Sequence, residues 1–379
     1  MHFDVIVVGG GPAGSSSAAL FARQGRRVLL LDAARFPRSK PCAEYISPGG
    51  VAILERLGVL AHLERLGTGR YLRGMELVAP EGGRHLVTYL RSDGVAQHGL
   101  AVSRMILDAC LLDAARSAGV EVRVGCRVAG VWCEAGRIKG VLATTGERLP
   151  ADLVVGADGI HSVVARDVGA RRRWTWPRRL GLVAHFEGID WPENYGQMFV
   201  GRQGYIGVAP LDADGLVSVG FVQDVPRGRL GPPLAALERG LANFPQLAQR
   251  LHAGRRVGSV TGVGPLARHV ARPAGPGFAL VGDAAGFFDP FTGEGIFRAL
   301  RSAELLTSNP DRYAVARRQH FAAKQRLVAL IQLIVQTPRL MDFAVRRLQS
   351  RPRTAHRLGA MLGDLEPARL DVAWRLLGP

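Results

Sequence analysis

Residues 3–14 read FDVIVVGGGPAG, and this stretch decides the class of fold. Its first six residues have the composition of a buried strand, and Gly9, Gly11 and Gly14 follow the spacing G-x-G-x-x-G. In this spacing the first glycine permits a tight turn from strand to helix, the second lets the backbone approach a pyrophosphate, and the third lets the helix lie close on the strand. The helix N-terminus then offers free N–H groups to phosphates. The stretch therefore predicts a dinucleotide-binding strand–turn–helix unit.

An acidic residue stands where such a unit needs one. A second apolar strand, residues 27–31, ends at Asp32, which follows Gly14 by 18 residues. A carboxylate at this place can accept hydrogen bonds from ribose hydroxyls. Because the glycine motif follows a strand, precedes a helix and has this acidic partner, we expect dinucleotide binding. A glycine-rich turn in another α/β fold is the alternative.

Length and composition exclude several classes of protein. The chain has 379 residues, of which 47% are hydrophobic, enough for one large domain or two ordinary ones. No apolar run approaches the roughly 18–20 residues that a membrane span needs, and the strand at the N-terminus leaves no place for a signal peptide. The four cysteines have neither C-x-x-C nor metal-ligand spacing. We therefore expect a cytoplasmic protein with no disulfide framework and no metal site.

The net charge of +17 comes almost entirely from arginine. A compositional bias of the genome, with solvated arginines, is one interpretation; attraction to an anionic substrate or to a membrane surface is the other. The last 75 residues are expected to form basic, apolar helices, which suit peripheral contact with a membrane. Nucleic acid is not an expected partner, because the basic residues are spread along the chain and no binding motif accompanies them.

The rest of the chain alternates between two patterns. Residues 71–95 read as a β-hairpin, and residues 180–225 as an antiparallel sheet. Residues 230–252 read as helix, and further helices are expected to begin after the N-caps Ser47 and Ser103. Two more buried strands each end in a Gly-Asp turn: DLVVGADG at residues 152–159 and GFALVGD at residues 277–283.

Three motifs together resemble the three FAD signatures of one flavoprotein superfamily. They are the first motif, GADG at residues 156–159 and GDAAG at residues 282–286. That superfamily contains aromatic hydroxylases, flavin halogenases and geranylgeranyl reductases. The resemblance covers residues 1 to about 305. It implies an α/β fold in which a Rossmann-like FAD-binding domain of the glutathione reductase type is interleaved with an antiparallel-sheet substrate domain and followed by a helical C-terminus. The implied FAD-binding segments are 1–70, 96–170 and 275–305, the substrate segments are 71–95 and 171–274, and the C-terminal helices are 306–379.

The resemblance also implies roles for single residues. Asp32 would bind the adenosine ribose, Arg104 would contact FAD, Asp283 would hold the ribitol side, and Asp158 would lie by the cofactor and support its second loop. The full set of implied cofactor-binding residues is Gly9, Gly11, Pro12, Ala13, Gly14, Asp32, Arg104, Asp158, Gly282, Asp283, Pro290, Gly293, Gly295 and Ile296.

A third glycine-rich segment has a physical role of its own. Gly293, Glu294 and Gly295 are predicted to lie at a helix N-terminus. Backbone N–H groups there can face the N1–C2=O edge of an isoalloxazine and stabilise the negative charge that develops on reduction, so we assign these three residues to the catalytic set. The alternative is that the two glycines merely form a turn.

Within the superfamily, the sequence is most similar to the geranylgeranyl reductase branch. Aromatic hydroxylases usually have His where this chain has Gly286. The segment KPCAE at residues 40–44 stands where the reductases have Lys-Pro-Cys-Gly. The halogenase motif Trp-x-Trp-x-Ile-Pro is matched in place by YIGVAP at residues 205–210, which has no Trp, and WTWP at residues 174–177 has the wrong spacing. The reductases also tend to have an aromatic residue where Gly207 stands, so we expect a roomier pocket.

Candidate residues for the substrate side follow from the same comparison. Cys42 is either a catalytic residue beside the flavin or a small buried thiol without reactivity. Four residues are candidates for lining the substrate pocket, with packing in the sheet or core as the alternative for each: Tyr45, His185, Tyr205 and Phe221.

These observations predict an FAD-dependent oxidoreductase that acts on a hydrophobic small molecule. The first expectation is hydride transfer from reduced flavin to a C=C bond of an isoprenoid- or lipid-like substrate, with NAD(P)H or another donor reducing the flavin without a separate nicotinamide domain. The alternatives are a flavin monooxygenase that hydroxylates or epoxidises a polyketide-like or aromatic substrate, and a cyclase that uses FAD without net redox turnover. A second G-x-G-x-x-G and a C-x-x-C pair are both missing, which argues against a flavin disulfide reductase. The oligomeric state is not predicted.

Overall fold

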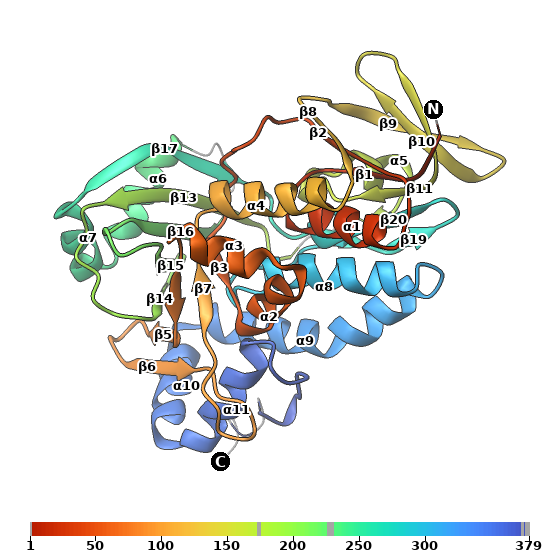
Figure 1. The fold of residues 1–379 in the computed structure, drawn as a ribbon. Helices are drawn as coiled ribbons and strands as arrows, with labels where there is room; N and C mark the ends of the chain where they lie inside the picture. The colour runs from red at the N-terminus through yellow and green to blue at the C-terminus, as the bar shows by residue number, and fades with distance from the viewer. Residues whose placement is uncertain (1, 173–175, 226–230, 373–374, 376–379) are drawn as a thin grey trace.

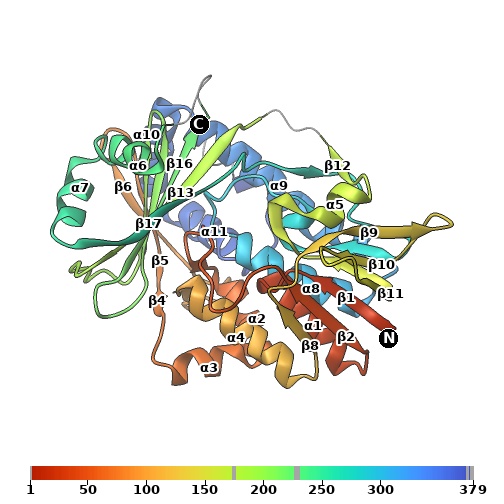
Figure 2. The ribbon, with the colours of Figure 1, turned by 90° about the horizontal axis from the view of Figure 1, so that it is seen from above.

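The computed structural model describes residues 2–172, 176–225, 231–372 and 375. Two large sheets stand side by side, and helices run between and beneath them (Figures 1 and 2). The architecture confirms the expected α/β class with a parallel sheet, an antiparallel sheet and a helical C-terminus. Trp174 and Thr175, which the sequence analysis compared with the halogenase motif, lie outside the described residues.

The first sheet is built around β1 (Phe3–Val8), which pairs in parallel with β2 (Val28–Asp32) and β11 (Arg148–Gly156). On its far side β11 pairs in parallel with β20 (Phe278–Leu280). The carboxyl ends of these strands therefore meet at one edge of the sheet, where the three glycine-rich motifs begin. The strands that complete this sheet are β8 (Glu121–Val124), β9 (Val128–Glu134), β10 (Arg137–Ala143) and β19 (Ala274–Gly275).

Small residues let α1 (Pro12–Arg23) pack closely on this sheet. Ala18 and Ala19 are buried against the side chains of Val5 and Val7. The other helices of this layer, α4 (Arg104–Ser117) and α8 (Gly295–Ser308), flank α1, and Figure 1 shows the three side by side. The predicted strand–turn–helix unit of β1 and α1 is confirmed. A further helix, α5 (Val163–Asp167), lies against β9 and β11.

The second sheet has seven strands in the order β17-β13-β16-β15-β14-β5-β6. Every pair is antiparallel except β14 with β5, so the hairpin of β5 and β6 joins the sheet made by residues 179–263. The predicted strands of residues 180–225 are all present. The bounds are β5 (Gly74–Val78), β6 (Arg84–Thr88), β13 (Arg179–Glu187), β14 (Gly196–Gly201), β15 (Gly204–Pro210), β16 (Val217–Asp224) and β17 (Arg255–Val263).

Two local features differ from the sequence analysis. The predicted helix of residues 230–252 is interrupted, because Pro245 starts a new one: its described part divides into α6 (Pro233–Leu241) and α7 (Pro245–His252). Strand β17 was not expected. Ser47 is the N-cap residue of α2 (Pro48–Leu57), as predicted; its hydroxyl donates to Asp364 Oδ2 at 2.7 Å and caps no backbone N–H.

The C-terminal helices are α9 (Tyr313–Val335), α10 (Pro338–Ser350) and α11 (Pro352–Leu362), each of the last two opened by a proline. Helices α10 and α11 cover the second sheet near β6, and α9 runs beneath α8, as Figure 1 shows in blue. Among the described residues no single helix has the length and hydropathy of a membrane span; α9 and α10 pass together but are bent by 113°. The remaining elements are β3 (Tyr45–Ile46), β4 (Arg70–Leu72), β7 (Gly99–Ala101), β12 (Arg171–Arg172), β18 (His269–Val270) and α3 (Val59–Arg65).

Candidate functional site

The turn between β1 and α1 is shaped for a pyrophosphate. Gly9 has φ +104°, and a Cβ atom on Gly14 would lie 1.7 Å from the carbonyl oxygen of Gly9, so neither position admits a side chain. A Cβ on Gly11 would meet only two guanidinium groups, those of Arg38 at 3.5 Å and Arg104 at 3.9 Å. The backbone of the glycine turn, the N-terminus of α1 and two cations therefore meet at one place. These residues fit the pyrophosphate of FAD.

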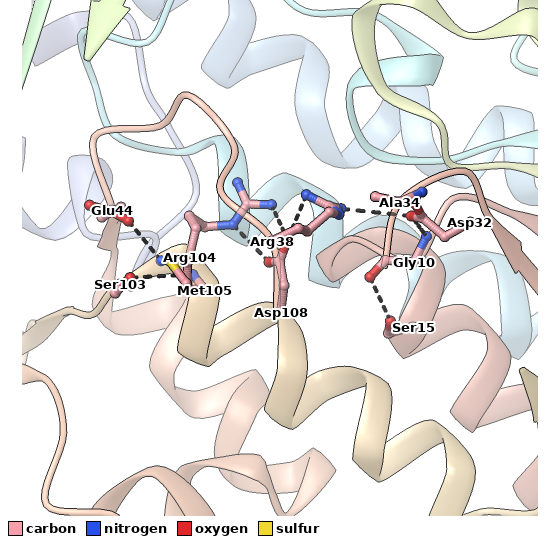
Figure 3. A network of polar contacts seen from close by, with 10 residues as sticks. All are labelled: Gly10, Ser15, Asp32, Ala34, Arg38, Glu44, Ser103, Arg104, Met105 and Asp108. Carbon is pink, nitrogen blue, oxygen red and sulfur yellow. Dashed lines mark hydrogen bonds and ion pairs between the residues drawn. The ribbon is translucent and has the colours of Figure 1, made fainter. Parts of the chain in front are cut away.

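A network of acidic and basic side chains fixes this turn (Figure 3). Asp32 is buried, and its carboxylate accepts hydrogen bonds from the backbone N–H groups of Gly10 and Ala34, each at 2.7 Å. Arg38 lies 3.2 Å from Asp108 and 3.8 Å from Asp32. Asp32 therefore holds the end of β2 against the glycine turn, at the position predicted for a ribose contact.

Arg104 is held in place by a bidentate ion pair. Its Nε and one terminal nitrogen donate to the two carboxylate oxygens of Asp108, both at 2.8 Å. Burial lowers the pKa of Arg104, but the interactions with Asp108 and with the Cys42 thiol outweigh burial and raise it. Arg104 therefore stays charged beside the Gly11 turn. Ser103, the residue before it, caps α4 as predicted, because its hydroxyl accepts a hydrogen bond from the backbone N–H of Met105.

The second and third motifs lie at the same edge of the sheet. Ala157, Gly159, Gly282 and Asp283 line the cavity that opens beside the turn. Asp158 faces elsewhere: its carboxylate accepts the backbone N–H of Val163 at 2.6 Å and so supports the loop, while burial raises its pKa.

The Gly293–Gly295 segment presents backbone to the cavity. Gly293 has φ +67°, and a Cβ on it would lie 2.6 Å from the ring of Tyr45. Glu294 is the N-cap residue of α8, but its carboxylate contacts Arg298 at 3.1 Å and Lys324 at 3.9 Å. The two glycines line the cavity, whereas the Glu294 side chain lies outside the lining. Any catalytic contribution of this segment therefore comes from its N–H groups.

One continuous cavity joins these motifs to the antiparallel sheet. Its wall on that sheet is apolar, and it contains Gly207 and Gly220, which stand directly opposite each other on β15 and β16. The side chains that line this wall are Val183, Met198, Tyr205, Val222, Val263 and Leu266, with Phe287 directly after the third motif. A second cavity lies at the opposite edge of the parallel sheet, lined by Asp4, Asp152 and Pro276 among others, and carries none of the motifs.

Both tyrosines predicted for the substrate side line the cavity, and both use their hydroxyls elsewhere. Tyr45 donates to the hydroxyl of Tyr89 at 2.5 Å, and Tyr205 donates to Asp289 Oδ1 at 2.6 Å. Burial raises the pKa of both cavity tyrosines well above its ordinary value. These residues therefore offer aromatic ring surface to a ligand.

The structure places the three other candidates for the substrate side, Cys42, His185 and Phe221, in different environments. Cys42 lines the cavity, and its Sγ accepts the backbone N–H of Glu44 at 3.4 Å. His185 lies behind the lining, where its Nε2 is 2.6 Å from Glu44 Oε2. Phe221 is not brought to the site: its ring packs where a Cβ on Gly240 of α6 would be, on the opposite face of the sheet. Because strand side chains alternate, Phe221 and the cavity-lining Gly220 and Val222 cannot share a face.

Sequence analysis missed a buried cluster behind Tyr205. Arg179, of which 2% is exposed, donates to Asp289 Oδ2 at 2.8 Å, and Gln332 of α9 donates to Asp289 Oδ1 at 2.7 Å. The cluster connects the third FAD motif, the antiparallel sheet and the C-terminal helices. It has no local signal in the sequence, because its members are far apart along the chain.

Two cations of the loop after β2 lie at the site and were not predicted from the sequence. Arg38 approaches the Gly11 turn, and Lys40 lines the cavity near Asp283 and Gly159. Burial, followed by the charge of Arg104, lowers the pKa of Lys40. Lys40 was part of the KPCAE segment compared with the reductases, but no binding role was predicted for it or for Arg38. Within the described ranges, no three His, Cys, Asp or Glu side chains gather as a metal site.

Comparisons with known proteins agree with this geometry. A family model described as an FAD binding domain matches residues 2–188. Menaquinone reductase of Mycolicibacterium smegmatis is 27% identical over 99% of this chain and 96% of its own length. Digeranylgeranylglycerophospholipid reductase of Methanothrix thermoacetophila is 32% identical over 80% of this chain and 76% of its own length. The solved structure of the flavin-dependent brominase Bmp2 superposes with a TM-score of 0.83 at 21% identity, covering 99% of this chain and 98% of that one.

Proposed function

Because the chain belongs to the superfamily of FAD-dependent oxidoreductases that includes the geranylgeranyl reductases and the group A flavin monooxygenases, we propose that it reduces a C=C bond of an isoprenoid- or lipid-like molecule by hydride transfer, with NAD(P)H as the electron donor. Both reductase relatives are named for lipid molecules, menaquinone and digeranylgeranylglycerophospholipid. These names suggest a lipid as the class of substrate, and the shape of the cavity supports it.

The observation that carries the proposal is the apolar wall of the cavity. Gly207 and Gly220 face each other on neighbouring strands, so two missing side chains leave a hollow in the sheet. Aliphatic side chains and the ring of Tyr205 surround this hollow. A hydrocarbon chain entering it would lose its contact with water, which favours binding by about 25 cal/mol for each Å² of apolar surface buried.

The chain's own residues then supply binding and orientation. The Gly11 turn, Arg38 and Arg104 would hold the pyrophosphate of FAD, and the N–H groups at Gly293 and Gly295 would stabilise negative charge on its ring. Bound FAD, once reduced, supplies the hydride. The apolar wall positions the double bond and excludes water from it.

An anaerobic reaction tests the proposed function. The enzyme, reduced with NAD(P)H under argon, is mixed with an unsaturated isoprenoid lipid, and flavin oxidation is followed by absorbance. We expect flavin oxidation together with a product that has gained two hydrogen atoms by mass spectrometry. A product that gains an oxygen atom only after air is admitted would identify a monooxygenase instead. A rearranged product of unchanged mass, formed without consumption of the electron donor, would identify a cyclase.

Filling the hollow provides a second test. Gly220→Leu adds a branched side chain where a Cβ atom would lie 3.7 Å from the Cβ of Ala43 and 3.9 Å from the carbonyl oxygen of Gly207. We expect kcat/KM for the lipid to fall about 5- to 150-fold, since steric overlap of this kind costs about 1–3 kcal/mol. FAD content is expected to stay unchanged. Gly220→Ala is the matched control, because its methyl group fits at ordinary contact distance; equal activity of the leucine and alanine variants would contradict this placement of the substrate.

A further inference from the structure

Glu44 stands in the cavity wall in a conformation that few residues adopt. Its φ is +58°, in the left-handed region, and only 3% of its surface is exposed. A non-glycine residue in this region carries strain, and burying a carboxylate also opposes folding. A glycine at position 44 would avoid both the backbone strain and the burial of a carboxylate. The carboxylate at this position therefore calls for an explanation in terms of its contacts.

Those contacts aim the carboxylate across the gap between the two sheets. Glu44 Oε1 accepts the backbone N–H of Arg104 at 2.8 Å, which fixes one oxygen on the FAD side. Glu44 Oε2 lies 2.6 Å from His185 Nε2, on β13 of the antiparallel sheet. Because Glu44 also lines the cavity, it connects the interior of the cavity with His185.

His185 in turn connects Glu44 with solvent. Its side chain is 28% exposed, whereas that of Glu44 is 4% exposed. The neighbouring strands present Ser218 of β16 and Val257 of β17 beside it, and Arg256 pairs with the next residue of β13. The hydrogen bond to Glu44 raises the pKa of His185 above its ordinary value of 6.5, against the effect of burial. The imidazole is therefore suited to carry a proton near neutral pH.

Reduction of a double bond needs such a proton. The hydride forms one new C–H bond with electrons from the flavin, and the π pair of the double bond forms the second C–H bond with a proton. The hydroxyls of Tyr45 and Tyr205 are already donated to Tyr89 and Asp289. Lys40 lies beside Asp283 and Gly159, at the cofactor's end of the cavity.

We propose that His185 and Glu44 form a relay that carries this proton from solvent into the cavity. His185 gives the proton on Nε2 to Glu44 Oε2, and Glu44 passes it to the carbon that does not receive the hydride. The O–H bond of Glu44 breaks, its electrons remain on the carboxylate, and His185 takes a new proton from solvent. Glu44 is then a catalytic residue, and His185 acts through it. The relay rests on the proposed function, because it serves the reduction of a double bond.

Two variants test the relay in the FAD-loaded enzyme. Glu44→Gln keeps the shape of the side chain but removes the proton that it donates, and we expect kcat for lipid reduction to fall about a hundredfold. For His185→Ala we expect a loss of about tenfold or more that added imidazole reverses. In the wild-type enzyme kcat should fall as pH rises through the raised pKa of His185, because the protonated imidazole is the donor. This alkaline fall should disappear in the His185 variant.

A readout that does not depend on turnover accompanies the rates. The pKa of His185, measured by NMR, should drop in Glu44→Gln, because the charged partner is gone. His2 provides the matched control, since it forms a similar pair with Asp152 at 3.0 Å on the exposed opposite edge of the parallel sheet. His2→Gln should leave kcat and the pH profile unchanged.

The outcomes separate the relay from the proposed function. If the wild-type enzyme reduces the lipid and Glu44→Gln does so at the same rate, the relay is wrong and the function stands. The relay is also wrong if imidazole fails to restore His185→Ala while FAD content is normal. If the wild-type enzyme reduces no double bond, the proposed function fails and the relay fails with it.

Discussion

Replacing Gly14 by alanine is expected to yield a protein that no longer retains FAD. The added Cβ would lie 1.7 Å from the carbonyl oxygen of Gly9 and 3.1 Å from the Cβ of Ala157, and backbone cannot move aside as a flexible side chain can. The helix would have to lift away from β1, which displaces its N–H groups from the pyrophosphate. Overpacking against backbone costs about 3 kcal/mol or more, so we expect both lost flavin absorbance and a lower unfolding temperature.

Gly83→Ala is the control for this substitution. Gly83 lies in the turn of the β5–β6 hairpin, and a Cβ there would meet only a side-chain carbon of Val345 at 3.6 Å. We expect that variant to bind FAD as the wild-type protein does. A yellow Gly14→Ala protein with a full complement of FAD would refute the packing that the structure gives α1.

The second large effect is expected on stability. Arg179→Met removes the cation that faces the buried carboxylate of Asp289 at 2.8 Å, while the hydrogen bonds from Tyr205 and Gln332 remain. An uncompensated buried charge of this kind destabilises by about 3–5 kcal/mol. The free energy of unfolding, measured by urea denaturation at neutral pH, should fall by that amount.

The pH dependence of this loss has a definite sign. Burial raises the pKa of Asp289 and Arg179 opposes that rise, so the pKa should increase further in the variant. A carboxyl whose pKa is higher in the folded state stabilises that state at low pH and loses this contribution as pH rises. The variant should therefore be closest to wild type in acid. Arg255→Met, which breaks an exposed pair with Glu187, should cost less than about 1 kcal/mol, and an equal loss in both variants would contradict the burial of the Arg179 cluster.

Sequence predicted the parts of this protein that depend on local chemistry. The FAD turn could be predicted because Gly9, Gly11 and Gly14 act within one short segment, and the apolar strands that feed it have a clear composition. The antiparallel strands of residues 180–225 followed from alternation and turn residues in the same way. The break before Pro245 was missed because residues 230–252 were read as helix throughout despite this proline.

The predictions that failed depend on side chains that meet only after folding. Phe221 is the right kind of residue for an apolar pocket, but one step along a strand decides which face it occupies, and α6 covers that face. Glu44 and His185 are 141 residues apart, and nothing local to either indicates the other. The same holds for Arg179 with Asp289, which are 110 residues apart.

The order of strands in the first sheet has a consequence for synthesis on the ribosome. Strand β1 is made first, but its neighbour β11 ends at Gly156, and β20, which pairs with β11, comes only at residues 278–280. Long-range pairing of this kind closes late, so one edge of β1 stays unpaired until β11 is made, and β11 then waits for β20. The lining of the cofactor cavity, which includes Gly293 and Gly295, is therefore complete only after residue 295 has been made.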